Sequence, residues 1–238
     1  MNEHLSSASL KSMAKGQLLG KYGTLTGAYA IHAACVALAS FSVYILIDTT
    51  SLIGNIMYYG ATFIISLLSG LFVCGEAYIY LKAACNQQVS VSDLFYGFSN
   101  APDKVLKIQA VLTLINLICT LPGTLFLPVA GTEADNPYLF LLFVILMLAG
   151  NIINIILSLT FSQSYYLMLD FPGYPPKEIL TMSRKVMKGN KGRLFYIELS
   201  FLPLFILGLC TCCITFLWIL PYYQAVKANF FLDLMKKK

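Results

Sequence analysis

The stretch MSRKVMKGNKGRLFYIELSFLPLFILGLC, residues 182–210, changes character halfway along its length. Its first half holds no acid and five cations, which are Arg184, Lys185, Lys188, Lys191 and Arg193. Its second half is almost entirely apolar. A basic run by itself would suggest a nucleic-acid patch or a targeting signal. A basic run that directly precedes a long apolar segment is instead typical of the cytoplasmic end of a membrane-spanning helix.

Composition supports a lipid environment for much of the chain. Hydrophobic residues make up 58% of the 238 residues, against roughly 45–50% in soluble domains. Charged residues make up 11%, against about 25% in such domains. So few charges could not cover the surface of a soluble protein of this size. The net charge of +5 therefore has to be interpreted from where the cations lie.

Long apolar stretches recur along the sequence. They cover residues 22–47, 56–81, 108–127, 138–159 and 194–220. About 20 helical residues span a hydrocarbon core of roughly 30 Å, so each stretch is long enough to cross. None alternates polar and apolar residues with a period of two, and backbone that faces lipid must satisfy its own hydrogen bonds. The stretches are therefore predicted to be helices.

The cations are sorted between alternate connections. Segments 48–55 and 128–137 contain no Lys or Arg, and all 16 cations lie in the N-terminal segment, in 82–107, in 170–193 or near the C-terminus. Cytoplasmic connections carry an excess of Lys and Arg. The N-terminus and the two basic connections are therefore predicted to be cytoplasmic.

The last three residues of the sequence are lysines, so they are also expected on the cytoplasmic side. With a cytoplasmic N-terminus, this requires an even number of crossings. The last apolar stretch then divides into spans 194–209 and 216–234, joined by a turn at 210–215. We predict an all-α, polytopic bundle of six transmembrane helices, a single membrane domain over residues 1–238, with both termini cytoplasmic. Five crossings and a terminal surface helix remain the alternative, because the second half of the last stretch is polar for a span.

Two segments outside the spans are amphipathic. Residues 7–19 and 176–189 place apolar side chains on one helical face and cations on another. This pattern predicts interfacial helices that lie in the headgroup plane. Anionic headgroups of the cytoplasmic leaflet attract such cations, so membrane lipids are the expected partners of the basic run in 182–195. Either the cations only anchor the helices, or they take part in regulated binding of a lipid or a partner.

Five motifs resemble, in order, a bacterial family of multi-pass membrane proteins known as domain of unknown function 975. They are LKSMAKGQLLGKYG (10–23), SDLFYGF (92–98), FSQSYYLMLD (161–170), MSRKVMKGNKGRLFYIELSFL (182–202) and LWILPYYQAVKANFF (217–231). The resemblance implies about six membrane helices in a bacterial cytoplasmic membrane and no assigned activity. The motif CTCCIT (210–215) departs from the family, whose members commonly carry a glycine-rich turn there.

Four ionisable residues fall inside predicted spans, where such groups are functional candidates by default. They are His32, Glu76, Glu198 and Lys227. Lys227 and the two glutamates are predicted at a similar depth on the inner side, so Lys227 is expected to pair with Glu198, Glu76 or both. There are two alternatives. The groups could remain unpaired, with their side chains extended towards the membrane surface, or they could form part of a proton or ion path. His32 has no second histidine nearby, which favours hydrogen bonding within the bundle over metal binding.

Uncharged polar residues mark two helix faces. A stripe with spacings of three and four follows the fourth apolar stretch, at Asn151, Asn154, Ser158 and Ser162. With Asn116 it is expected either to form interhelical hydrogen bonds or to line a hydrated cavity. Ser66, Gly70 and Cys74 recur every four residues, a spacing of small residues that lets helices approach closely.

Recognised catalytic signatures are missing from the sequence, and the cations do not gather on a soluble domain that could bind nucleic acid. No cofactor or metal site is predicted, since Cys210, Cys212 and Cys213 lack a second thiol pair. The favoured interpretation is a non-enzymatic integral membrane protein that acts through lipids, assembly with a second copy, or another membrane protein. The alternative is a small-solute transporter or permease component. An intramembrane enzyme that uses Glu76 or Glu198 is the third.

The two leading interpretations make different structural predictions. A polar cavity between helices, lined by Asn151, Asn154 and Glu76, would favour transport. A dry bundle, in which neighbouring side chains satisfy these groups, would favour the role in assembly.

Overall fold

The described part of the chain is entirely helical. The computed structural model describes residues 5–49, 51–132, 137–211 and 215–236, with side chains at all of these except 52, 121–132 and 137. The α-helices are α1 (Ser7–Leu18), α2 (Tyr22–Leu46), α3 (Leu52–Ala84), α4 (Tyr96–Ser99), α5 (Pro102–Thr132), α6 (Pro137–Phe161), α7 (Ser164–Asp170), α8 (Pro176–Met187), α9 (Lys191–Leu199), α10 (Leu202–Cys210) and α11 (Phe216–Met235). A 3₁₀ helix, η1 (Val91–Phe95), precedes α4.

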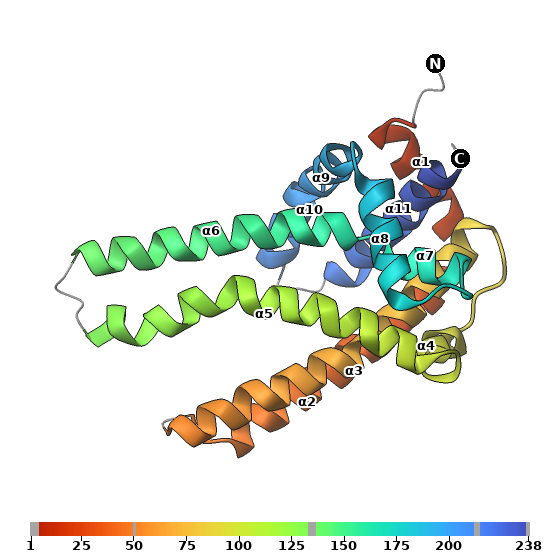
Figure 1. Cartoon of the computed structure of the whole chain (residues 1–238). Helices are drawn as coiled ribbons and strands as arrows, with labels where there is room; N and C mark the ends of the chain where they lie inside the picture. Colours follow the sequence, from red (N-terminus) through yellow and green to blue (C-terminus); the bar gives the residue numbers. More distant parts are fainter. Residues whose placement is uncertain (1–4, 50, 133–136, 212–214, 237–238) are drawn as a thin grey trace.

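Two long antiparallel helix pairs form the frame of the molecule. The pairs α2–α3 and α5–α6 extend as arms from one end of the molecule, where most of the short helices gather (Figure 1). The shortest of these four helices has 25 residues and the longest, α3, has 33. At 1.5 Å per residue they are about 37–50 Å long, more than the roughly 30 Å of a hydrocarbon core.

Four segments are long and apolar enough to cross a membrane, judged by length and composition. They are Tyr22–Leu46, Ile53–Ala84, Tyr138–Asp170 and Lys191–Cys210. The helix α5 has the length, but the side chains of its outer part lie beyond the described residues. The helix α11 is less apolar, because it carries polar residues such as Lys227 and Asp233. The helical fold is thus confirmed, and its membrane character rests on four apolar segments.

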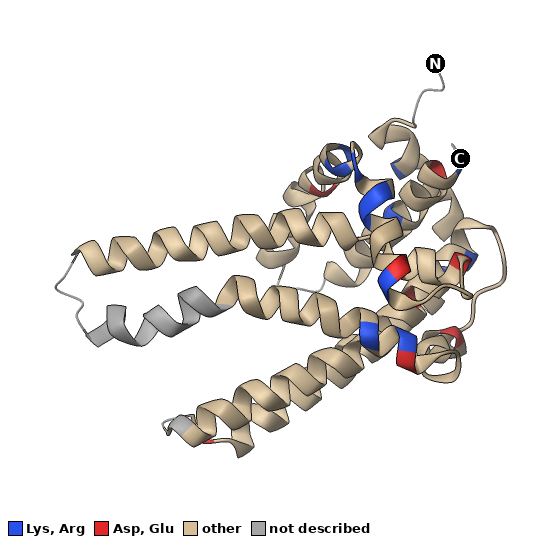
Figure 2. Cartoon of the chain, in the orientation of Figure 1, with Lys and Arg blue, Asp and Glu red and all other residues tan. Residues whose placement is uncertain are grey.

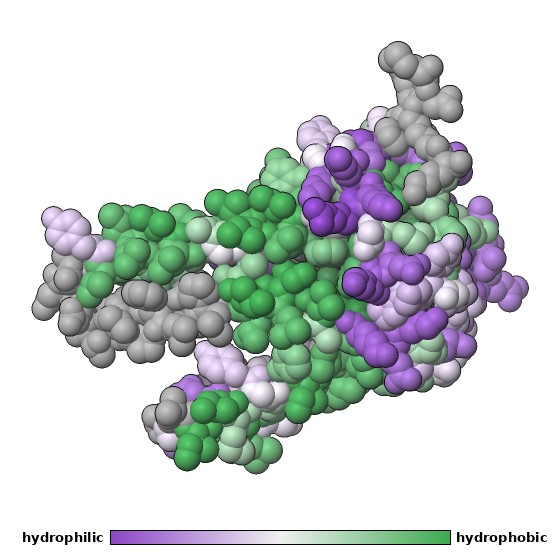
Figure 3. Space-filling view, in the orientation of Figure 1, coloured by the Kyte–Doolittle hydropathy of each residue, from purple (hydrophilic) through white to green (hydrophobic). Residues whose placement is uncertain are grey.

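The charged residues gather at one end of the molecule. Nearly all described Lys, Arg, Asp and Glu lie among the short helices, away from the tips of the long arms (Figure 2). The arms are hydrophobic on the surface that Figure 3 displays. Side chains such as Leu38, Phe41 and Ile45 of α2 are exposed on them. Soluble monomeric proteins rarely expose large continuous hydrophobic patches of this kind.

The helix α11 is a core element, because other helices cover it. It contacts α1, α2 and α3, and residues of its C-terminal half such as Val226, Ala228 and Phe230 are fully buried. The polar residues of 220–234 therefore face protein instead of lipid. This explains how a helix with so low an apolar content can sit in the centre of the molecule.

The segment predicted at 7–19 forms a helix, but its surroundings differ from the prediction. Ser6 caps α1 by accepting a hydrogen bond from the Ser9 amide at 3.1 Å. The apolar face of α1, formed by Leu10, Ala14 and Leu18, is completely buried against α11 and α3. Protein thus covers the face that was predicted to lie on lipid.

The segment predicted at 176–189 likewise forms α8, with Ile179, Val186 and Met187 buried. It packs against α5, α6 and α7. Its cations remain exposed on the opposite side. Again, protein covers the apolar face, and only the basic face is free to meet headgroups.

The span predicted as one helix over 194–209 is broken. The helix α9 ends at Leu199 and α10 begins at Leu202, with Pro203 in its first turn. Proline lacks the amide hydrogen that would bond to Leu199, and its ring would clash with that carbonyl group. The regular α-helix is therefore interrupted at Ser200–Phe201, although both residues keep right-handed helical backbone angles and Lys191–Cys210 remains one apolar segment.

Candidate functional site

A cavity of about 320 Å³ lies between α3, α5, α6, α7 and α11. Eight uncharged polar side chains and one lysine contribute to its lining, together with apolar residues. Polar side chains inside an apolar bundle are unfavourable unless they are hydrogen-bonded to each other or to a ligand. Their contacts therefore show what the cavity can bind.

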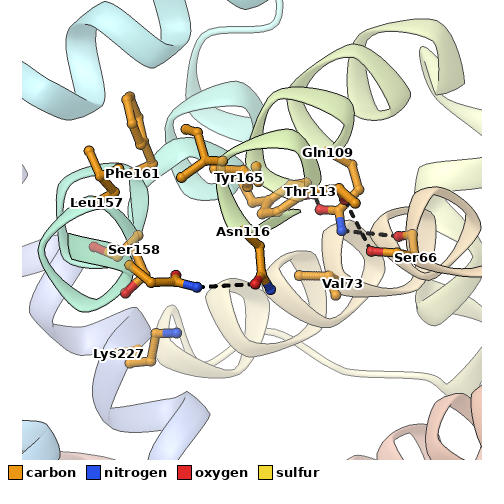
Figure 4. Close-up of a pocket in the computed structure, with 14 residues that line it drawn as sticks. Ser66, Val73, Gln109, Thr113, Asn116, Leu157, Ser158, Phe161, Tyr165 and Lys227 are labelled. Carbon is orange, nitrogen blue, oxygen red and sulfur yellow. Dashed lines mark hydrogen bonds between the residues drawn. The ribbon is translucent and has the colours of Figure 1, made fainter. Parts of the chain in front are cut away.

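The helix α5 supplies one polar wall of the cavity. Its polar residues follow spacings of four and three, at Gln109, Thr113 and Asn116. Residues at these spacings lie on one face of a helix. The Gln109 side chain donates to the Ser66 carbonyl oxygen at 3.0 Å and accepts from the Tyr165 hydroxyl. The hydroxyls of Thr113 and Ser66 are also 3.0 Å apart. These bonds fix α3, α5 and α7 around the cavity (Figure 4).

Close approach of α3 and α5 depends on a glycine. A Cβ atom at Gly70 would lie 2.5 Å from Cγ of Gln109, which is far inside contact distance. The prediction that Ser66, Gly70 and Cys74 form a close-packing face is confirmed at the first two positions. The small residues let the Gln109 amide reach the backbone of α3.

The polar stripe of α6 is partly on the cavity. Asn154 donates to the Asn116 side-chain oxygen at 3.1 Å, which confirms the predicted hydrogen bond between the two helices. Ser158 and Ser162 also line the cavity, although each hydroxyl donates to a carbonyl oxygen of its own helix. Asn151 does not line it, and donates instead to the Met147 carbonyl oxygen.

Lys227 is the one charged residue among those that line the cavity. Its ammonium group lies 5.3 Å from the centre of the Tyr223 ring. In the described part of the chain it forms no ion pair within 4.0 Å and no hydrogen bond. Figure 4 shows Lys227 reaching from α11 into the space that Asn116 and Ser158 border.

The predicted direct pairing of Lys227 with a glutamate is not observed. Glu198 accepts a hydrogen bond from the Tyr223 hydroxyl at 3.0 Å. Glu76 lies 2.8 Å from Nδ1 of His32. Both carboxylates act electrostatically on Lys227, but each has another direct partner. Depth along a helix does not specify which way a side chain faces, so groups of similar predicted depth can have different direct partners.

His32 and Glu76 form a separate polar group between α2 and α3. The second ring nitrogen of His32 lies 3.2 Å from the Ser69 hydroxyl, and its ring stacks on Phe72 with centres 5.2 Å apart. These contacts confirm that His32 is hydrogen-bonded inside the bundle. Neither His32 nor Glu76 lines the cavity, so the proposed cluster of candidate residues is not a single site. Glu198 and Asn151 belong neither to the cavity lining nor to the pair of His32 and Glu76.

The basic run also divides. Arg184, Lys185 and Lys188 are exposed on α8 or just beyond it, as the prediction of lipid-facing cations requires. Arg193 instead points inward and forms an ion pair with Asp233 of α11 at 2.9 Å. Its guanidinium also donates to the Leu5 carbonyl oxygen at 3.1 Å. The prediction that Arg193 faces lipid is therefore wrong, because a buried carboxylate lies within its reach.

Sequence reasoning overlooked several polar residues of the cavity, including Gln109, Thr113 and Tyr165. A signal was available for the first two, because with Asn116 they form a stripe on the third apolar stretch like the one on the fourth. Tyr165 gave no such signal, since tyrosines are common throughout the chain. Asp233 was overlooked as the partner of Arg193 for a different reason. The two residues are 40 positions apart, and nothing in the sequence links them.

Metal ligands do not gather in the part of the chain that was described. No group of three or more His, Cys, Asp or Glu lies close enough there to hold an ion. Cys210 is free and exposed, while Cys212 and Cys213 lie outside the described residues. What the cavity offers chemically is an ammonium group beside amides and hydroxyls, which is a set of hydrogen-bond partners suited to an anionic group.

Comparison with known proteins identifies the family. The family described as "Protein of unknown function (DUF975)" matches the chain over residues 1–238. The chain belongs to this family. No curated protein and no solved structure matches the chain. Membership therefore confirms the resemblance of the five motifs, and what this DUF975 protein does has to be inferred from its own cavity and surfaces.

Proposed function

We propose that this DUF975 protein is a six-crossing protein of the bacterial cytoplasmic membrane that binds a small anionic solute in the cavity. Its role would be that of a small-solute transporter or permease component. The observation that supports the proposal is Lys227, a cation without an ion-pair partner in the described chain, directed into a polar cavity between largely apolar helices.

The preference for an anion follows from electrostatics. An ammonium group that is withdrawn from water is unfavourable unless it meets an opposite charge. Glu198 and Glu76 act on Lys227 from outside the cavity lining, and no carboxylate is among the described residues that line it. A bound carboxylate or phosphate would therefore be the anion in direct contact with the ammonium group. Interactions between charges are stronger in such surroundings than in water. Asn116 can assist, since its amide oxygen is engaged by Asn154 and its amide hydrogens can donate.

The cavity favours this role over the one that the sequence favoured first. A protein that acts only through lipids, assembly or partners needs no polar cavity between its helices. The space is lined by Asn154 as the transport alternative predicts, although Glu76 and Asn151 are absent from it. The polar residues that line the cavity instead include Gln109, Asn116 and Lys227.

Six crossings would comprise the four apolar segments together with α5 and α11. The support is that α1 and the end of α11 pack together, and that the Leu5 amide donates to Asp233 at 3.3 Å. Residues near the two ends of the chain are thus at the same charged end of the molecule. An even number of crossings is the arrangement that permits this.

Ligand-dependent stability tests the proposal. Purified protein in neutral detergent would be melted with inorganic phosphate, acetate or succinate, and with glycerol and choline as uncharged and cationic comparisons. A ligand at 100 times its Kd stabilises a protein by about 2.7 kcal/mol. We expect at least one anion to raise Tm by several degrees, and Lys227→Met to abolish the rise.

The control is Lys236→Met, which removes an exposed cation from the end of α11. It should keep the anion-dependent rise, and Lys227→Arg should keep part of it. The proposal is contradicted if no anion stabilises the wild type, or if Lys227→Met responds as the wild type does.

A further inference from the structure

A second site lies on the outside of the molecule, where α6, α8 and α9 meet. It has two parts, a groove and a corner. The groove is lined by Ile152, Ile155, Ile156 and Leu159 of α6 and by Gly192 and Phe195 of α9, with Lys191 at one end, and has a volume of about 380 Å³. Apart from Lys191 its described lining is apolar, and the four residues of α6 follow the spacing of a single helix face.

The corner is basic. Arg184, Lys185, Lys188 and Lys191, with Thr181, surround a space of about 480 Å³. No acid is among the described residues around it, and none of the four cations forms an ion pair with a described carboxylate. Four like charges this close repel one another, so they favour the presence of an anion between them.

Local sequence explains how the corner forms. Thr181, Arg184 and Lys185 share the exposed side of α8, and Lys188 follows directly after the helix. Gly189, at φ +85°, then turns the chain in a conformation that other residues adopt with difficulty. The turn brings Lys191, the first residue of α9, back beside the cations of α8.

Lys191 belongs to both parts of the site. The corner and the groove are therefore adjacent, with cations around one and apolar side chains along the other. Figure 2 places the cations of α8 and α9 at the inner end of α6, and Figure 3 shows hydrophilic and hydrophobic surface meeting there. A ligand that fills both parts must carry a negative group attached to a long apolar chain.

We propose that this site binds one anionic phospholipid, with its phosphate in the basic corner and an acyl chain in the groove between α6 and α9. A free phosphate would use the corner alone, and a nucleic acid would leave the groove empty. The inference is independent of the cavity, with which it shares no residue. It also differs from general attraction to a charged membrane, because it requires a defined chain-binding groove.

Charge neutralisation tests the corner. Full-length protein in neutral detergent would be titrated with dioleoyl phosphatidylglycerol or dioleoyl phosphatidylcholine, and bound lipid would be counted by native mass spectrometry. Arg184→Gln, Lys185→Gln and Lys188→Gln together should weaken phosphatidylglycerol binding roughly 100-fold, at about fivefold per cation. The matched control is Lys107→Gln, Lys177→Gln and Lys236→Gln, which removes three exposed cations from other places.

The groove has its own variant. A Cβ atom at Gly192 would meet no atom within 4 Å and its φ is ordinary, so Gly192→Phe can fill the groove without straining the fold. We expect the wild type to bind dioleoyl phosphatidylglycerol roughly tenfold more tightly than the dihexanoyl lipid, and Gly192→Phe to lose this preference. Gly23→Phe, at an equally open position of α2, should keep it.

Three outcomes would overturn the proposal. Equal binding of phosphatidylglycerol and phosphatidylcholine would exclude a phosphate corner that selects charge. Equal losses in the corner variant and its control would show that only total charge matters. A chain-length preference that survives Gly192→Phe would show that the groove is not used. Unchanged Tm and elution volume of each variant would establish that it is folded.

Discussion

At the scale of single residues, the buried carboxylates meet partners from other helices. Glu76 of α3 contacts His32 of α2, and Asp233 of α11 contacts Arg193 of α9. Such pairs contribute little when compared with a well-packed apolar core, but losing one partner leaves a charge buried and unpaired. They therefore fix which helices are neighbours more than they add to stability.

The ion pair between Arg193 and Asp233 allows a test of what is lost when one partner is removed. Asp233 keeps 7% of its side-chain surface exposed and Arg193 keeps 26%. We expect Arg193→Ala to lower the free energy of unfolding by about 3 kcal/mol, because the buried Asp233 carboxylate would lose the guanidinium group that lies 2.9 Å away. Chemical or thermal unfolding in detergent would measure the loss.

Two further variants make the measurement specific. Arg184→Ala removes an exposed, unpaired arginine of the same run and should change stability by less than about 0.5 kcal/mol. Arg193→Ala combined with Asp233→Ala should cost less than the sum of the single losses. Additive losses would mean that the two side chains do not stabilise each other.

At the scale of elements, small residues set how closely the long helices pack. Gly150 of α6 faces the backbone of α5, and a Cβ atom there would lie 2.2 Å from the Cys119 carbonyl oxygen. A backbone atom cannot rotate away as a side chain can. The two helices would have to separate, and Asn154, one turn further along α6, would lose its bond to Asn116.

We therefore expect Gly150→Ala to destabilise the protein by roughly 1–3 kcal/mol, the usual cost of overpacking. Gly60→Ala is the matched control, because a Cβ atom on that residue of α3 would meet nothing within 4 Å. It should be neutral or slightly stabilising, since alanine favours helix. Tm measured in the same detergent would distinguish the two, and equal values would contradict close packing of α5 on α6.

At the scale of the whole molecule, most described cations and the described residues nearest the two ends of the chain lie on one side. The Leu5 carbonyl and the Asp233 carboxylate both bond to Arg193, so three distant parts of the sequence meet at one point. The long arms point away from this side (Figure 1). A membrane around the arms would leave the charged end in the cytoplasm, where Lys and Arg are retained.

Reporter fusions test this arrangement in cells. A fluorescent protein that folds only in the cytoplasm should be active when it is fused after Lys238. Alkaline phosphatase, which is active only outside, should be inactive at the same position. The same pair inserted after Asp48, beside the tip of the α2–α3 arm, should give the reverse result. Alkaline phosphatase activity at the C-terminus would exclude six crossings.

The sequence by itself determined the helical class and the division of the chain into apolar segments. Hydrophobic length and the sorting of cations are properties of consecutive residues, so they can be read without a structure. The break at 200–201 was also within reach, because Pro203 cannot continue a helix. The family followed from motifs spread along the chain.

Only the tertiary structure decided which polar residues meet. Depth in a helix follows from counting residues, but the direction of a side chain depends on how each helix is rotated against its neighbours. For that reason Asn154 and Asn116 met as predicted, whereas Lys227 faced a cavity and Arg193 turned inward to Asp233. The burial of the apolar faces of α1 and α8 has the same cause, since an amphipathic helix can cover its apolar face with protein or with lipid equally well.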